Sequence, residues 1–369
     1  MNIALIELYI IQMPLKSPFI THLGAVANRE GIIVKITDKD GITGFGEGVA
    51  FSTPWYTEET VTTSLHMLSD ILIPMLKQHP IKRPEDAAQA FQSIRRNHMA
   101  KAALETALWD LYAKQQTSSL SAMLNGTRNV IASGVVVATD STANALKQIE
   151  QYLKEGYQRI KVKINPKQDY AFLAEIRKVY PELPIMADAN SAYTLNDIDR
   201  IKALDELNLL MIEQPLGQDD IIEHAILQKE MKTPICLDES IVNFEDARKA
   251  VELGSCRVIN IKVGRVGGLL EAKKIHDYCF LHNIPVWCGG MIEFGVSRAH
   301  NIALASLPGF TIPGDISSSN RFWEEDIIDP EVEVKDGLIK VPNSPGIGFS
   351  INEKRLNETL LSKRIFDFR

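Results

Sequence analysis

From about residue 130 onward, short apolar runs alternate with longer stretches in which apolar residues recur every three or four positions. The short runs have the length of β-strands, and the longer stretches have the period of amphipathic helices. Such alternation indicates parallel strands joined by crossover helices. The strand candidates are GVVVA, RIKVKI, PIMADAN, LLMIEQP, PICLDES, RVINIKV, PVWCGG and FTIPGDI. Eight candidates in a row favour a closed barrel over an open doubly wound sheet, and no G-x-G-x-x-G follows the first strand.

The first 125 residues have a different pattern. Strand-like segments come first, with a turn at Asp38-Lys39-Asp40-Gly41 that predicts a hairpin, and helical patterns follow. This order is typical of an α+β domain. After residue 320 the alternation stops, and we expect that part to return to the N-terminal domain. The predicted organisation is an α+β domain over 1–125, a barrel over 126–320 and a C-terminal segment over 321–369.

Composition indicates an ordinary globular protein of 369 residues, 45% hydrophobic and 24% charged, with a net charge of −7. The chain has no basic stripe, which argues against a nucleic-acid or membrane partner, and no apolar run long enough to span a membrane. Its four cysteines lack zinc or C-x-x-C spacing, as in reduced cytosolic proteins. The N-terminus is apolar but carries Glu7 and lacks a basic start. We therefore expect a strand there, not a signal peptide, and a cytoplasmic protein.

Charged residues recur at the ends of the strand candidates. Lys163, Asp188, Glu213 and Asp238 follow one another at intervals of 25 residues, and Lys262 comes 24 residues later. One interval is one strand-helix unit, so these side chains are predicted to occupy equivalent heights. In a barrel the carboxyl ends of the strands meet at one mouth. The lysines of the stretch IKVKI (160–164), which could also form a solvated outer face, are therefore predicted to lie inside.

Three carboxylates at one mouth would repel one another unless a cation lay between them. Ligands that are all oxygen select a hard divalent cation, and three acids that each give one oxygen leave positions for water and substrate, which favours Mg²⁺. Taken singly, each acid could instead cap a helix or lie in a solvated loop. Asn190, two residues after Asp188, could support the metal ligands or form an Asx-turn.

The lysines suit proton transfer. Lys161 and Lys163 share one face of their strand, so each disfavours protonation of the other, and the metal ion adds to this effect. We expect both effects to lower the lysine pKa toward neutrality, where an amine can act as a general base. Lys262 lies four strands further on and should occupy the opposite wall. This arrangement suits removal of a proton α to a carboxylate, with Mg²⁺ stabilising the resulting enediolate.

Two further motifs bear on the function. The glycine-rich stretch RVGGLLEA (265–272) stands at a predicted helix start, where it could bind an anion or form a tight turn. The chain has no G-x-S-x-G motif, so a serine hydrolase mechanism has no support.

The strand-end motifs together resemble those of the enolase superfamily, muconate-lactonizing subgroup. The family's motifs are K-x-K, D-x-N, E-x-P, D-E-S and N-x-K-x-x-R-x-G-G. In this chain they are Lys161/Lys163, Asp188/Asn190, Glu213/Pro215, Asp238-Glu239-Ser240 and Asn260/Lys262/Arg265/Gly267/Gly268. The resemblance covers essentially the whole chain. It implies a modified (β/α)7β TIM-type barrel beneath an N-terminal α+β capping domain.

Within the subgroup, the stretches FSTPWYTEET, MAKAALETALWDLYAK and CGGMIEFGVSRAHN are most similar to the branch of o-succinylbenzoate synthases and N-succinylamino acid racemases. The resemblance implies dehydration of a cyclohexadiene carboxylate in menaquinone synthesis, or racemisation of N-acylated amino acids. A dipeptide epimerase, a cycloisomerase and a non-catalytic metal-binding scaffold remain alternatives. No histidine replaces Lys262, which argues against the mandelate-racemase subgroup.

The resemblance also implies roles for individual residues. Lys163 would be the base and then the acid, and Lys262 its partner on the opposite face. Mg²⁺, for which Mn²⁺ could substitute, would be held by Asp188, Glu213 and Asp238. We expect a small carboxylate substrate and a homo-oligomer. Segments around Phe19–His22 and Phe51–Tyr56 would close over the substrate. The residues expected to bind the substrate or support the site are Asn190, Glu239, Arg265, Phe19, His22, Phe51, Trp55 and Glu293.

Overall fold

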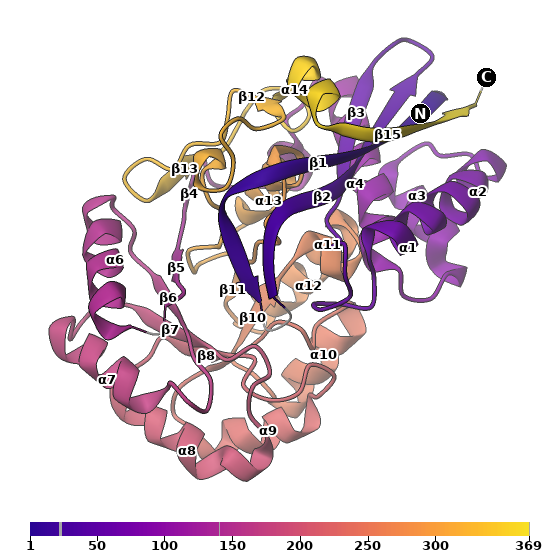
Figure 1. Ribbon diagram of the computed structural model, residues 1–369. Helices are drawn as coiled ribbons and strands as arrows, with labels where there is room; N and C mark the ends of the chain where they lie inside the picture. The colour runs from indigo at the N-terminus through magenta and orange to yellow at the C-terminus, as the bar shows by residue number, and fades with distance from the viewer. Residues whose placement is uncertain (22–23, 140, 369) are drawn as a thin grey trace.

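The computed structural model describes residues 1–21, 24–139 and 141–368. Its N-terminal part is a four-stranded antiparallel sheet with the order β15-β1-β2-β3. The strands are β1 (Ile3–Thr21), β2 (Gly24–Asp38), β3 (Thr43–Gly48) and β15 (Leu360–Asp367). The predicted hairpin is confirmed, because β2 ends at Asp38 and pairs with β3. The pairing of β15 with β1 brings the two chain termini to the same side of the molecule (Figure 1).

Helices cover one face of this sheet. The long helix α4 lies so close to β3 that a Cβ on Gly44 or Gly46 would meet the main chain of α4 at 2.3 or 2.1 Å, so these positions require glycine. The apolar side chains of the sheet and helices form a hydrophobic core separate from that of the barrel. The elements are α1 (Val61–His66), a π-helical segment (Met67–Leu72), α2 (Ile73–Gln78), α3 (Pro84–Ala90) and α4 (His98–Gln115).

The middle of the chain forms a curled, parallel, seven-stranded sheet with helices outside it (Figure 1). The strands lie in chain order, β5 to β11, each paired with its sequence neighbour. Their bounds are β5 (Val135–Val137), β6 (Ile160–Lys163), β7 (Ile185–Asp188), β8 (Met211–Glu213), β9 (Ile235–Leu237), β10 (Val258–Ile261) and β11 (Val286–Cys288).

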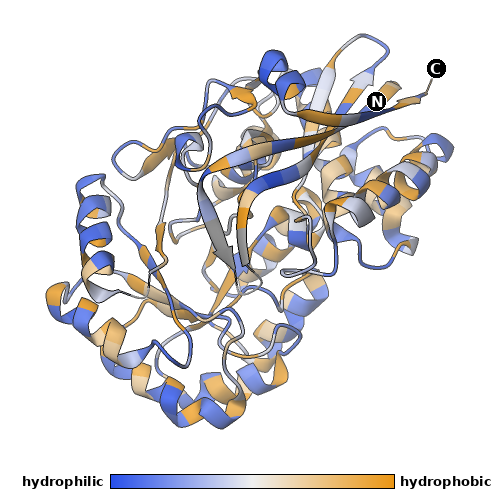
Figure 2. Ribbon diagram, viewed as in Figure 1, coloured by the Kyte–Doolittle hydropathy of each residue, from blue (hydrophilic) through white to orange (hydrophobic). Residues whose placement is uncertain are grey.

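The helices around the sheet have mixed colours in Figure 2, as expected for amphipathic helices with one face on a core. They are α6 (Thr142–Lys154), α7 (Tyr170–Val179), α8 (Ile198–Ala203), α9 (Ile222–Glu230), α10 (Phe244–Leu253), α11 (Val263–Val266), α12 (Leu269–Leu281) and α13 (Gly295–Ala305). Within the described residues, no helix is both long enough and apolar enough to cross a membrane.

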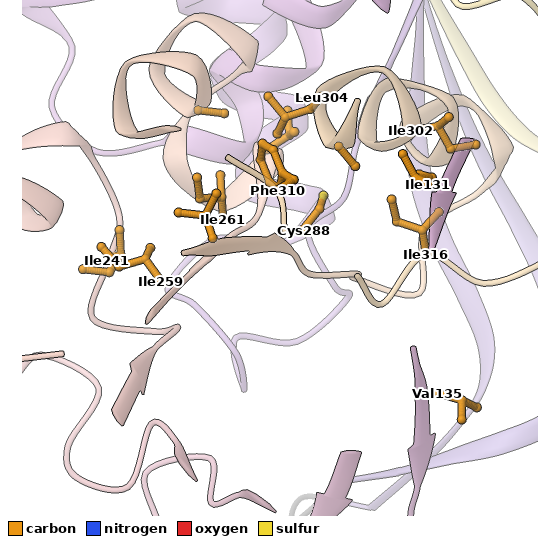
Figure 3. Close-up of a cluster of buried hydrophobic side chains, with 14 of the residues drawn as sticks. Ile131, Val135, Ile241, Ile259, Ile261, Cys288, Ile302, Leu304, Phe310 and Ile316 are labelled. Atoms are coloured by element: carbon orange, nitrogen blue, oxygen red, sulfur yellow. The ribbon is translucent and has the colours of Figure 1, made fainter. Parts of the chain in front are cut away.

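The eighth strand candidate, FTIPGDI (310–316), is not a regular strand. It makes isolated parallel bridges to Val286 of β11 and to Ser133, just before β5. Gly134 also donates to the carbonyl of Gly314 at 2.7 Å, and Asp315 donates to that of Cys288 at 2.9 Å. The segment therefore closes the barrel between β11 and β5. Apolar side chains from β10, β11, α13 and this segment gather in the core drawn in Figure 3.

The end of the chain contacts both parts of the molecule. A short strand β13 (Leu338–Lys340) pairs with β4 (Val130–Ala132), and β12 (Ile328–Asp329) pairs with β14 (Ser350–Ile351). Helix α14 (Glu353–Glu358) then leads into β15. The short helix α5 (Leu120–Met123) links the N-terminal part to the barrel.

Candidate active site

The strand register places the predicted residues side by side at the carboxyl ends of the barrel strands. Lys163 of β6 is paired with Asp188 of β7, and Asp188 with Glu213 of β8. Glu213 is paired with Cys236 of β9, and Asp238 follows two residues later on the same face. Lys262 directly follows β10, four strands from β6 in the sheet order. Three carboxylates thus lie at the mouth of the barrel, on strands between those that carry Lys163 and Lys262.

Lys161 points into the barrel, as the spacing predicted. It is 5% exposed, and its ammonium lies 2.6 Å from Asp315 Oδ2, 3.1 Å from Glu213 Oε2 and 3.3 Å from Asp188 Oδ2. Without a metal ion, the side chains around Lys161 do not lower its pKa. Burial does lower the pKa of Lys161, but the carboxylates of Asp315, Glu213 and Asp188 outweigh burial, and the net pKa is raised. The carboxylates around Lys161 therefore favour its ammonium form.

Lys163 is more exposed and reaches the open side of the mouth. Its ammonium donates to Asp188 Oδ2 at 2.6 Å and to Asn190 Oδ1 at 2.5 Å. Asn190 in turn donates to Glu239 Oε1 at 3.1 Å. Burial raises the pKa of Glu239, whose Oε2 is buried without a hydrogen-bond partner among the described residues. Hydrogen bonds thus connect Lys163 through Asn190 to Glu239. The Oε2 atom of Glu239 has a free lone pair, which can accept a hydrogen bond from a substrate.

Lys262 lies on the opposite wall, 8% exposed, with its ammonium 2.8 Å from Asp238 Oδ2 and 2.9 Å from the Tyr56 hydroxyl. Arg265 holds the other oxygen of Asp238 and donates to the same hydroxyl at 3.1 Å. Burial lowers the pKa of Lys262, but Tyr56, Glu239 and Glu213 outweigh burial and the net pKa is raised. These neighbours thus favour the ammonium form of Lys262.

The three strand-end carboxylates have the chemistry of a hard-cation site. Asp188 and Glu213 are 1% and 0% exposed, and burial followed by the charge of Asp188 raises the pKa of Glu213, a repulsion that a cation would relieve. Every ligand atom that these side chains offer to a cation would be an oxygen. As the side chains stand, however, lysines and Arg265 occupy these oxygens. Within the described residues, no three acidic, histidine or cysteine groups are close enough to enclose an ion. Binding a metal would require the lysine and arginine side chains to release these oxygens and the three carboxylates to come closer together.

The segment Phe51–Tyr56 covers this mouth from the N-terminal domain. Phe51 is buried and its ring lies 4.7 Å from that of Trp55, which lies 5.8 Å from that of Tyr56. Tyr56 is the residue whose side chain contacts Lys262, Arg265 and Asp238. It was expected only as part of this segment. The sequence did contain a signal for this role. A tyrosine among apolar residues needs a polar partner for its hydroxyl when it is buried.

The remaining predicted residues lie as follows. His22 lies outside the described residues, and of Phe19 only the backbone is described, which pairs with Val26. Glu293 is 3% exposed and accepts from Asn301 Nδ2 at 3.1 Å and from the backbone of Met291, so it supports its own loop. Asp315 was missed. Its signal was present, since it is a carboxylate near the end of the eighth strand candidate.

Known proteins share this architecture over the whole chain. Residues 5–125 match the family of mandelate racemase / muconate lactonizing enzyme N-terminal domains, and residues 144–355 match the enolase C-terminal domain-like family. The chain belongs to the enolase superfamily. An o-succinylbenzoate synthase of Geobacillus stearothermophilus is 54% identical, with 99% of this chain and 98% of that protein covered. An N-succinylamino acid racemase of Thermus thermophilus is 46% identical over 94% of each chain.

A solved member of the superfamily from Listeria innocua has a TM-score of 0.98 to this chain at 44% identity, with 100% of both chains covered. The barrel and its N-terminal partner are therefore arranged in this enolase superfamily member as in its relative.

Proposed function

We propose that the chain is an o-succinylbenzoate synthase, a lyase that dehydrates a cyclohexadiene carboxylate to o-succinylbenzoate in menaquinone biosynthesis. The single observation that carries this proposal is the pair of lysines on opposite walls of one carboxylate-lined mouth, in a chain that matches a synthase over 99% of its length. Synthases of Geobacillus stearothermophilus and Bacillus subtilis are 54% and 52% identical to it.

Lys163 is the residue best placed to move the proton. Its side chain reaches the open part of the mouth, whereas Lys161 is enclosed by carboxylates. As an amine, Lys163 would take the α-proton of the substrate, and as an ammonium it would give that proton to the departing hydroxyl, so that water leaves and a carbon-carbon double bond forms. Lys262, an ammonium held by Asp238 and Tyr56, would face the other side of the planar anion and stabilise its negative charge.

Asp188, Glu213 and Asp238 are the residues that would hold a divalent cation, and we propose Mg²⁺, with Mn²⁺ able to replace it. When bound, the cation supplies positive charge for the carboxylate of the substrate as that group gains electron density. Asn190 and Glu239 support this side of the mouth through their hydrogen bond. The substrate would be a small carboxylate, and nucleic acid and membrane are not expected as partners.

N-succinylamino acid racemisation is a second candidate activity of the same site. The observation that favours it is the placement of Lys262 across the mouth from Lys163, because racemisation needs one group to remove a proton and another to return it on the opposite face. The racemase of Thermus thermophilus is 46% identical to this chain. Both activities share the first step, which is removal of the α-proton.

A side-by-side assay tests the proposal. The purified protein with Mg²⁺ is given the cyclohexadiene carboxylate and, separately, N-succinylamino acids in deuterated water. We expect dehydration of the first, with or without racemisation of the second. Racemisation without dehydration would make the second candidate the function. If neither substrate reacted or exchanged its α-proton, the chain would be a binding scaffold and the proposal would be wrong.

Three further proposals concern the whole protein. We infer a division into a capping domain (1–125), a barrel (126–320) and a C-terminal segment (321–369). We also propose a cytoplasmic homo-oligomer. The pairing of β15 with β1 supports a C-terminal segment that belongs with the capping domain.

A further inference from the structure

Arg29, near the middle of β2, is a buried arginine outside the set of residues considered so far. It is 2% exposed. Its guanidinium donates to Val49 O at 2.6 Å, to Ala50 O at 2.7 Å and to Ile292 O at 3.3 Å, and also to the carbonyl of Glu30. The residues it joins are far apart in sequence. Val49 and Ala50 begin the capping segment (residues 49–56), and Ile292 belongs to the barrel loop (residues 289–293) that follows β11.

The same two segments pack together through apolar side chains. Val49, Ala50 and Phe51 of the capping segment form a buried cluster with Met291 of the barrel loop and Met99 of α4. Trp55, Tyr56 and Ile292 pack against this cluster. The Arg29 guanidinium lies over the Phe51 ring, 4.4 Å from its centroid, a cation–π contact. One side chain thus connects the polar and the apolar parts of the contact between the capping segment and the barrel loop.

Ile292 is held in a strained conformation at this contact. Its φ is +55°, in the left-handed region that a β-branched residue avoids. Such a conformation persists only where surrounding contacts impose it, and the bond from Arg29 Nε to Ile292 O is one of them. The barrel loop also contains Gly289, where a Cβ would come within 2.6 Å of Lys262 Cε. The conformation of this loop therefore bears directly on the space beside Lys262.

Arg29 keeps its positive charge in this buried position. Burial lowers the pKa of Arg29 to about 10, with Glu47, Glu293 and Glu30 opposing that change, so it remains a guanidinium at neutral pH. The oxygens of Glu47 are bonded to Phe294 N at 2.8 Å and Ser297 N at 2.7 Å, and those of Glu293 to the Met291 backbone and the Asn301 side chain. The guanidinium thus directs its own donors to main-chain carbonyls and makes no direct ion pair with these acidic side chains.

We propose that Arg29 is a positioning residue that sets the substrate pocket by holding the capping segment and the barrel loop in one fixed arrangement over Lys262. This inference rests on the proposed function only for its kinetic arm, since the arrangement itself can be measured in the protein without substrate. Tyr56, at the end of the capping segment, contacts Lys262, and Gly289, at the start of the barrel loop, leaves space beside it. Arg29 acts on the substrate through these two walls and does not touch the reacting atoms.

The test compares Arg29→Lys with a matched control. Lysine keeps the charge, but one ammonium cannot reach the carbonyls of both segments. Arg177 is the control, because it also donates to main-chain carbonyls, namely those of Leu207, Tyr180, Pro181, Leu183 and Asn208, but it lies on α7. For Arg29→Lys we expect KM for the dehydration substrate to rise about tenfold while kcat falls less than about threefold, the pattern of lost substrate binding. Arg177→Lys should lower thermal stability and leave KM unchanged.

Amide hydrogen exchange is the second measurement, and it needs no substrate. In Arg29→Lys, exchange should accelerate in both residues 49–56 and residues 289–293, and in Arg177→Lys in neither. If only one segment loosened, or if KM stayed within about twofold of the wild type, the proposal would be overturned. If the wild type lacked the assayed activity, the proposed function would fail while hydrogen exchange still tested Arg29. Arg29→Gln is the second variant, and failure of both variants to fold would show that Arg29 holds the whole fold and not a pocket wall.

Discussion

At the scale of single residues, the lysines of the mouth differ in the number of carboxylates that they contact. Lys161 is enclosed by Asp315, Glu213 and Asp188, whereas Lys163 and Lys262 each contact one carboxylate and one uncharged group. The spacing of 25 residues was enough to predict that these side chains share one mouth. The protonation of Lys161 and Lys262 was not predictable in the same way, because it depends on Asp315 and Tyr56, which come from segments outside that spacing.

The first prediction concerns the two faces of the substrate. With an N-succinylamino acid in deuterated water, Lys163→Ala should stop α-proton exchange from one enantiomer and Lys262→Ala from the other, because the lysines lie four strands apart. Loss of a positioned base costs on the order of a hundredfold or more in rate. NMR of deuterium incorporation measures this. If either variant still exchanged both enantiomers at near wild-type rates, the two lysines would not serve opposite faces.

The second prediction concerns the Tyr56 hydroxyl, which accepts from Lys262 and Arg265. Tyr56→Phe keeps the ring over Lys262 but removes hydrogen bonds to two cations, each worth about 1.5–3 kcal/mol. Exchange from the enantiomer that Lys262 serves should fall about tenfold, while exchange from the other enantiomer should change little. Tyr170→Phe, which removes a hydroxyl bonded to the exposed Glu206, is the control. An equal loss for both enantiomers would show a general packing defect.

At the scale of elements, two barrel helices have their N-terminal caps in the other domain. Helix α12 begins after Gly268, which has no side chain, and its first amides donate to Glu105 of α4 at 2.8 and 2.9 Å. Helix α13 has no capping side chain of its own, and Glu47 of β3 accepts from its N-terminal amides. The anion considered for the stretch RVGGLLEA is thus a carboxylate of the same chain. Both caps were unpredictable from local sequence, because the partners are far apart along it.

The third prediction uses the pKa of Glu105, which burial raises to about 7, against hydrogen bonds from Leu270, Leu269 and Trp109 that lower it. In the unfolded chain this carboxyl has an ordinary pKa near 4.5. The folded protein therefore binds the proton more tightly, and this contribution to stability is present below pH 4.5 and lost as the pH rises through 7. The glutamine in the variant Glu105→Gln cannot titrate. As the pH rises from 4.5 to 8, the free energy of unfolding of this variant should therefore increase by about 3 kcal/mol relative to that of wild type.

Denaturant unfolding of wild type and Glu105→Gln at several pH values measures the difference in free energy of unfolding. Comparison with the variant removes the contribution of Glu47, whose pKa burial also raises, to about 8. A difference that did not change with pH, or that moved in favour of wild type as the pH rose, would show that the amides at the start of α12 stabilise the ionised carboxylate enough to cancel its burial.

At the scale of the whole molecule, the barrel and its helices followed from the apolar pattern, since each strand-helix unit is local in sequence. Two features did not follow. The segment 310–316 closes the barrel through isolated bridges, because Pro313 within it has no amide hydrogen to donate to regular pairing. The contact between the capping segment and the barrel loop depends on Arg29, whose partners lie up to 263 residues away. Long-range main-chain contacts of this kind leave no periodic signal.

The fourth prediction concerns the metal and the whole active site. Removing divalent cations with a chelator should abolish turnover, and Mg²⁺ or Mn²⁺ should restore it, because Asp188, Glu213 and Asp238 lie at adjacent strand ends and the charge of Asp188 raises the pKa of Glu213. Full activity after thorough chelation would contradict the three-carboxylate site.

Glu213→Gln tests the same site without an activity assay. A neutral amide is a poorer ligand for a hard cation, so we expect weaker Mn²⁺ binding when the metal is titrated and followed by its paramagnetic resonance. Glu230→Gln, at an exposed glutamate paired with Lys202, should bind Mn²⁺ as wild type does. Glu213 is wholly buried and its Oε2 accepts from Lys161, so the amide would also leave Lys161 with Asp315 and Asp188 as its anionic partners. An unchanged titration in Glu213→Gln would mean that Glu213 serves to neutralise Lys161 and not to hold a metal.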